Sequence, residues 1–109
     1  MSMHLPRPIE IFFSPDTAHD TDALTTCFAV DATVRDEGRT FEGLAAITAW
    51  RTETRKQYRY TVEPVEAVRR DGQTVVTARV SGDFPGSPVT LTFIFRLERG
   101  HITSLEIRP

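Results

Sequence analysis

Three tight-turn sequences divide the second half of this 109-residue chain into segments of alternating polarity. Asp71-Gly72 is a strong signal for a two-residue hairpin, Pro85-Gly86 suits the centre of a type II turn, and Arg99-Gly100 is a third short turn. Connections this short can join only antiparallel neighbours. The segments 58–68, 74–84, 89–98 and 102–107 are therefore predicted to form an antiparallel meander.

The third of these segments indicates which face of the sheet is buried. Leu91, Phe93, Phe95 and Leu97 share one face, and the opposite face carries Thr90, Thr92, Ile94, Arg96 and Glu98. Such alternation is typical of a sheet with one packed face and one face that is wet or in an interface. Arg79 and Arg96 are expected on the outer face.

The first half of the chain has helical spacing. Helices are predicted near 6–14, where prolines suit the first turn, near 20–28, where Asp20 could cap the helix, and over 43–57. A short strand is predicted over 32–36, with Val34 and Asp36 on the same side.

The third helix has two rows of side chains. Leu44, Ile47, Trp50 and Thr54 form its predicted inner row, and Arg51, Arg55 and Arg59 form an outer row that is expected to be solvated. Basic excess is too small for a nucleic-acid patch.

The element order is therefore α-α-β-α-β-β-β-β in a single domain spanning 1–109. This order predicts an α+β fold in which a curved, mainly antiparallel sheet wraps around the helices.

Composition excludes several classes of function. The chain has a net charge of -2 and no apolar run of membrane-spanning length, so neither a nucleic acid nor a membrane is expected as a partner. No signal peptide is evident, and one cysteine excludes an internal disulfide. A cytoplasmic location is the expectation.

Three stretches, His19–Leu24, Phe28–Asp36 and Phe41–Ile47, carry a recognisable pattern. A helix ends in an aromatic residue, a D-A-T-V-x-D strand follows, and a glycine precedes the next helix. This pattern, with the hairpin-linked strands, resembles the NTF2-like (cystatin-like) superfamily, and most of all its SnoaL-like and ketosteroid-isomerase-like branch. The resemblance covers nearly the whole chain.

The resemblance implies a cone-shaped fold that encloses a pocket between sheet and helices. Asp36 falls where ketosteroid isomerases keep a proton-shuttling aspartate, and Trp50 falls where they keep an aromatic pocket wall. Ala78, Val80, Gly82 and Phe84 fall on the pocket side of a strand. Dimerisation through the outer sheet face is common in the family, so a homodimer is implied here.

Two departures from the isomerases bear on activity. Phe12 replaces the tyrosine that donates a hydrogen bond to the oxyanion, and Phe93 stands where they keep a protonated acid. An enolate would lack these two stabilising donors, and that stabilisation is usually the largest contribution to such catalysis. Classical steroid isomerase activity is therefore not expected.

Asp36 is the candidate catalytic residue, as a general base on an apolar strand face. The alternative is that it begins the turn at Asp36-Glu37-Gly38 and bonds nearby amides. Glu37, Arg39, Thr61 and His101 are the polar groups that could converge on it.

Aromatic and aliphatic residues beyond the needs of close packing could form an apolar ligand cavity. The predicted pocket residues are Phe12, Phe28, Val34, Trp50, Val80, Phe84, Phe93 and Phe95. His4, His19 and His101 lack ligand spacing, so no metal site is predicted, and no cofactor is expected. Cys27 is expected to be a structural residue of the second helix.

These observations leave three functions open. The first is an isomerase- or cyclase-type enzyme in which Asp36 moves a proton on a small, largely apolar carbonyl compound. The second is a module that binds an apolar small molecule without chemistry. The third is a dimeric interaction scaffold.

Overall fold

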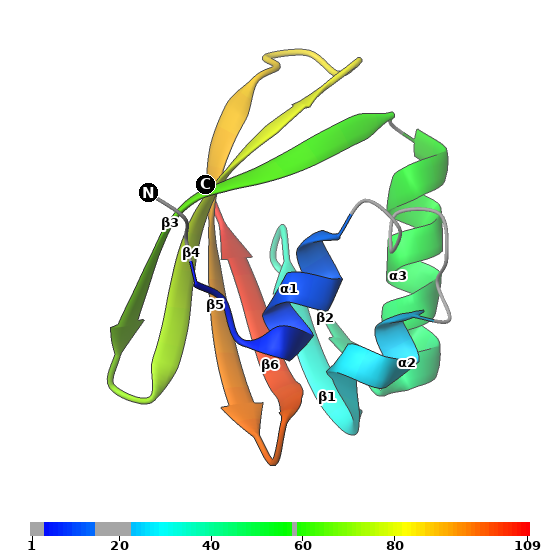
Figure 1. Cartoon of the computed structure of the whole chain (residues 1–109). Coiled ribbons are helices and arrows are strands. Elements are labelled where there is room, and N and C mark those ends of the chain that lie inside the picture. The colour runs from blue at the N-terminus through cyan, green and yellow to red at the C-terminus, as the bar shows by residue number, and fades with distance from the viewer. Residues whose placement is uncertain (1–3, 15–22, 58) are drawn as a thin grey trace.

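The computed structural model describes residues 4–14, 23–57 and 59–109, and its main feature is one strongly curved sheet. The sheet has six strands in the order β2-β1-β6-β5-β4-β3. The three helices lie on one side of it (Figure 1). The predicted α+β fold is confirmed.

The described helices lie within the ranges predicted from the sequence. They are α1 (Arg7–Phe13), α2 (Leu24–Cys27) and α3 (Leu44–Gln57). Pro6 and Pro8 flank the start of α1, where a missing amide hydrogen costs nothing. Asp20, the predicted cap, lies outside the described residues. Among the described residues, no helix combines the length and hydrophobicity that crossing a membrane requires.

The strands follow the predicted meander. They are β1 (Phe28–Asp36), β2 (Arg39–Glu42), β3 (Tyr60–Arg70), β4 (Gln73–Gly82), β5 (Val89–Glu98) and β6 (His101–Arg108). The pairs β3–β4, β4–β5 and β5–β6 are antiparallel, as the three short turns require. β6 also pairs in parallel with β1, and so joins the first half of the sheet to the second.

The β1–β2 hairpin was not predicted. Its turn consists of Glu37 and Gly38, which both have positive φ, of 53° and 76°. Asp71 and Gly72 have the same pair of values, which is the geometry that favours glycine in two-residue hairpins. The correct element order is therefore α-α-β-β-α-β-β-β-β.

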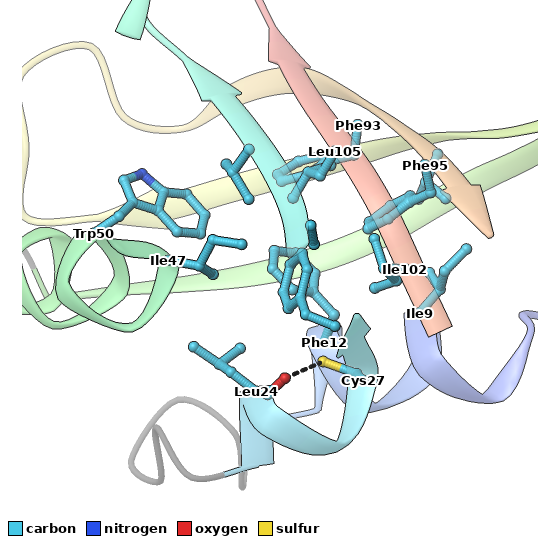
Figure 2. Packing of buried hydrophobic residues seen from close by; sticks show 14 of the residues in the cluster. Ile9, Phe12, Leu24, Cys27, Ile47, Trp50, Phe93, Phe95, Ile102 and Leu105 are labelled. Atoms are coloured by element: carbon cyan, nitrogen blue, oxygen red, sulfur yellow. Dashed lines mark hydrogen bonds between the residues drawn. The ribbon is translucent and has the colours of Figure 1, made fainter. Parts of the chain in front are cut away.

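The hydrophobic core fills the space between the helices and one half of the sheet. Figure 2 shows α1 and α2 side chains meeting those of the strands. Phe28, Leu24, Ile47, Phe95, Ile102 and Leu105 are fully or almost fully buried there. Phe12, Trp50 and Phe93 also belong to this core and form its border with a cavity.

Candidate functional site

A cavity of about 1210 Å³ opens at the other end of the sheet. The strands β1, β4 and β6 end there, and β3 and β5 begin there. This arrangement follows because neighbouring strands are antiparallel, except β1 and β6, which are parallel. α1 and the C-terminal half of α3 form the facing wall. Residues far apart in the sequence are thus brought to one place.

Five of the predicted pocket residues line this cavity. They come from α1, α3, β4, the β4–β5 loop and β5, and are Phe12, Trp50, Val80, Phe84 and Phe93. Leu91 and Ile107 add further aliphatic surface. The lining is therefore largely apolar on the sheet side.

Three predicted pocket residues lie elsewhere. Phe28, Val34 and Phe95 are 0–1% exposed and belong to the core cluster. Phe28 begins β1 and Phe95 lies near the end of β5, so both sit at the end of the sheet that α1 and α2 cover. Strand parity correctly places these side chains on the inner face. It does not show how far along the strand the cavity reaches.

Asp36 ends β1 and lines the cavity, half-buried. The indole Nε1–H of Trp50 donates a hydrogen bond to its Oδ2 over 3.1 Å. This bond links the end of β1 to α3, so the carboxylate is oriented by the helix and not by amides of its own turn. The second oxygen, Oδ1, receives no hydrogen bond from the described residues.

Trp50 is held on two sides. It is 9% exposed, and its ring lies 6.1 Å from that of Phe41, centroid to centroid. The guanidinium of Arg51, which also lines the cavity, lies 5.6 Å from its centroid. The prediction that Trp50 is buried on the inner row of the long helix is confirmed.

Phe12 and Phe93 both line the cavity and contact each other edge to face. Their ring centroids are 6.2 Å apart, and Phe13 makes edge contacts with both. Neither ring can donate a conventional hydrogen bond. The two positions at which the resemblance would place oxyanion donors are therefore apolar surface.

The expectation of a solvated arginine row is wrong for buried Arg51 and half-buried Arg55, whereas Arg59 follows α3 and is exposed. Arg51 is 5% exposed, and Arg51, Arg55 and Arg59 all line the cavity. Arg51 stacks on Phe12, with its Cζ 4.6 Å from the ring centroid. Burial lowers the pKa of Arg51 from its ordinary value, and the like charge of Arg55 lowers this pKa further. Sequence periodicity missed this because a face over a concave sheet has the same spacing as a solvated face.

The other polar candidates are divided between two places. Glu37 and Thr61 line the cavity, whereas Arg39 is exposed and stacks on Phe41. His101 lies beside Asp31 at a separate depression of about 650 Å³ near the β5–β6 turn. His4 is exposed and His19 lies outside the described residues. Within 4–14, 23–57 and 59–109, no cluster of three or more metal-ligating side chains occurs.

Cys27 is fully buried between α2 and the core. Its Sγ–H donates to the carbonyl of Leu24 over 3.6 Å, as the dashed line in Figure 2 marks. Burial raises the pKa of this thiol to about 11, against a smaller opposing effect of Arg51. A thiol with so high a pKa is a packing group and not a nucleophile.

A curved sheet that closes over helices around a cavity defines the NTF2-like fold. A structure with this fold from Cytophaga hutchinsonii superposes with a TM-score of 0.74 at 13% identity, covering 97% of this chain and 90% of that one. A protein with a ketosteroid isomerase-like fold from Catenulispora acidiphila, solved in complex with trimethylamine, superposes with a TM-score of 0.83 at 24% identity, covering 97% of this chain and 87% of that one.

Within this class, the chain belongs to the SnoaL-like domain family, whose model matches residues 12–105. A protein from Sinorhizobium meliloti with the working designation polyketide cyclase is 44% identical, with a TM-score of 0.89 over 95% of both chains. An LEH-like epoxide hydrolase from Mycobacterium tuberculosis shares the fold at 13% identity, with a TM-score of 0.74, covering 94% of this chain and 79% of that one. The curated proteins include no match to this chain.

Proposed function

We propose that this protein is a proton-transfer enzyme of the cyclase or isomerase type, acting on a small, largely apolar carbonyl compound with Asp36 as the general base. The observation that carries the proposal is the orientation of Asp36, whose Oδ2 is held by Trp50 while the carboxylate faces the cavity. A general base must be fixed within reach of the proton it removes.

In the proposed reaction, the Asp36 carboxylate takes a proton from a carbon next to the substrate carbonyl. The electron pair of the broken C–H bond moves onto the carbonyl oxygen and gives an enolate. In a cyclase, the enolate carbon then forms a bond to a second carbonyl carbon of the same molecule, and the new alkoxide takes the proton back from Asp36. In an isomerase, the proton returns to a different carbon.

The cyclase form is supported by the S. meliloti protein, which is named for such an activity and is 44% identical to this chain. The classical steroid isomerase form is disfavoured, because Phe12 and Phe93 supply no hydrogen bond to an oxyanion.

The test is proton exchange in deuterium oxide. A panel of apolar cyclic ketones and β-diketones would be incubated with the protein, and loss of the α-proton signal followed by NMR. We expect the wild type to accelerate exchange on at least one compound and Asp36→Asn to lower that rate about 10²- to 10⁴-fold, as general-base removal does. Asp31→Asn is the matched control, because Asp31 lies exposed on the same strand, away from the cavity.

A non-catalytic binding module is the second candidate, and the paired Phe12 and Phe93 rings favour it. It would be established if compounds bind with unchanged affinity to wild type and Asp36→Asn while neither protein accelerates exchange. Exchange that survives in Asp36→Asn would instead contradict Asp36 as the base.

A further inference from the structure

Arg51 is a buried cation without a counter-ion among the described residues. Its side chain comes from the middle of α3, is 5% exposed and lines the cavity. The ion pairs in the described parts of the chain are Arg7–Glu10 and Arg108–Glu106, and both lie on the surface. The Nε of Arg51 is buried and no described group accepts its hydrogen.

Arg55 places a second positive charge beside the first. It lies one helical turn further along α3, and its Nη1 donates to the carbonyl of Tyr60 over 2.8 Å. Its Cζ lies 4.0 Å from the Tyr60 ring centroid, and its Nε is also buried without a partner in the described structure. Two cations therefore share one wall of the cavity.

The surroundings of Arg51 hold its guanidinium without neutralising it. The rings of Phe12 and Trp50 lie 4.6 and 5.6 Å from its Cζ and cover it by cation–π contacts. A stacked guanidinium keeps its N–H edge for a planar acceptor. Asp36 accepts its hydrogen bond from Trp50, and no ion pair joins it to Arg51 among the described residues.

Leaving a guanidinium buried and unpaired is costly, and an incoming anion would remove that cost. The apolar floor of Phe93, Leu91 and Val80 lies in the same cavity. The two features together describe a ligand with an apolar body and one anionic group.

We propose that Arg51, supported by Arg55, is a specificity-determining site that binds a carboxylate on the substrate. A carboxylate is favoured because its two oxygens match the planar fork of a guanidinium. The inference rests on the proposed function, since it assigns the substrate's second functional group in the same cavity, but its test requires binding and no turnover.

The experiment compares two ligands that differ only in charge, adamantane-1-carboxylate and adamantane-1-carboxamide. Neither absorbs in the tryptophan region, and Trp50 is the one tryptophan of the chain and lines the cavity, so its fluorescence reports binding. We expect the wild type to bind the carboxylate at least about tenfold more tightly, the range of hydrogen bonds to charged groups.

Arg51→Met keeps the length of the side chain and removes the charge, so the preference for the carboxylate should disappear. Arg79→Met is the matched control, because it removes one charge from an exposed position on β4 and should keep the preference. Arg51→Lys should give an intermediate preference, since it keeps the charge and loses the fork.

Asp36→Asn separates this proposal from the proposed function. It should lower the exchange rate about 10²- to 10⁴-fold and leave the preference for the carboxylate intact. Equal binding of the two ligands by the wild type would overturn the proposal, and this measurement needs no variant to fold. A preference that persists in folded Arg51→Met would overturn it as well.

Discussion

At the scale of single residues, Trp50 connects packing to chemistry. Its ring fills space between α3 and β2, and its Nε1–H fixes the carboxylate of Asp36. A side chain with both an apolar body and a donor is needed for this, and phenylalanine would supply only the first. Stability and orientation of the base are therefore separable by substitution.

We expect Trp50→Phe to lower the free energy of unfolding by about 1 kcal/mol, because it keeps the ring and loses one hydrogen bond. Trp50→Ala should cost about 3 kcal/mol, the lower end for large aromatic truncations, since one side of the ring already faces the cavity. Urea unfolding followed by circular dichroism measures both. A loss below about 1 kcal/mol for Trp50→Ala would contradict this account of its packing.

The buried thiol of Cys27 should make the free energy of unfolding depend on pH in the alkaline range. The thiol pKa is about 11 in the fold against 9.0 for an unperturbed thiol, so the unfolded chain ionises first as the pH rises. The unfolded state then binds fewer protons than the folded state, and stability falls. The stabilisation that comes from burying the protonated thiol is fully present below pH 9 and is lost between pH 9 and about 11.

The measurement is the difference in unfolding free energy between the wild type and Cys27→Ala at several pH values. Groups that titrate equally in both proteins cancel in this difference. The advantage of the wild type should shrink as the pH rises from 9 to about 11. A constant difference over that range would show that the thiol is not protected by burial.

At the scale of elements, local signals decided what the sequence could predict. The β3–β6 meander follows from the three tight turns, and α3 follows from its regular apolar spacing. β2 was missed because Arg39–Glu42 is a four-residue strand in which Phe41 alone is partly buried. A strand so short has too few positions to show an alternating pattern.

The same reasoning explains which part of the site could be predicted. Asp36 and Trp50 were found because the family pattern surrounds them, and both line the cavity. Arg51 and Arg55 were predicted to be solvated. Their i, i+4 spacing shows that they share one face of the helix, but it does not show whether that face contacts solvent or the sheet. The curvature of the sheet decides this, and it is set by pairings between distant segments.

At the scale of the whole molecule, the sheet has an inner face covered by helices and an outer face without a covering element in the described structure. The outer face mixes exposed Arg79 and Arg96 with half-buried Thr77 and Ile94. An uncovered sheet face of this kind is where we expect a second copy of the chain to dock.

We expect a homodimer formed through this outer face. Equilibrium sedimentation at micromolar concentration should give about twice the 12.3 kDa mass of one chain. Ile94→Glu should shift the protein to a monomer without unfolding it, whereas Val30→Glu, at an exposed position on β1 away from β4 and β5, should not. A wild type that sediments as a monomer would rule out the dimer.

The position of β6 has a consequence for how the protein is made. β6 lies between β1 and β5, and its contacts with β1 pair residues such as Phe28 and Ile102 that are far apart in the chain. A nascent chain that still lacks β6 holds two separate groups of strands with open edges, and pairing over such separations is slow. Asp36 and the β5 wall of the cavity meet only after β6 has left the ribosome, so the binding site cannot form before β6 is free to pair.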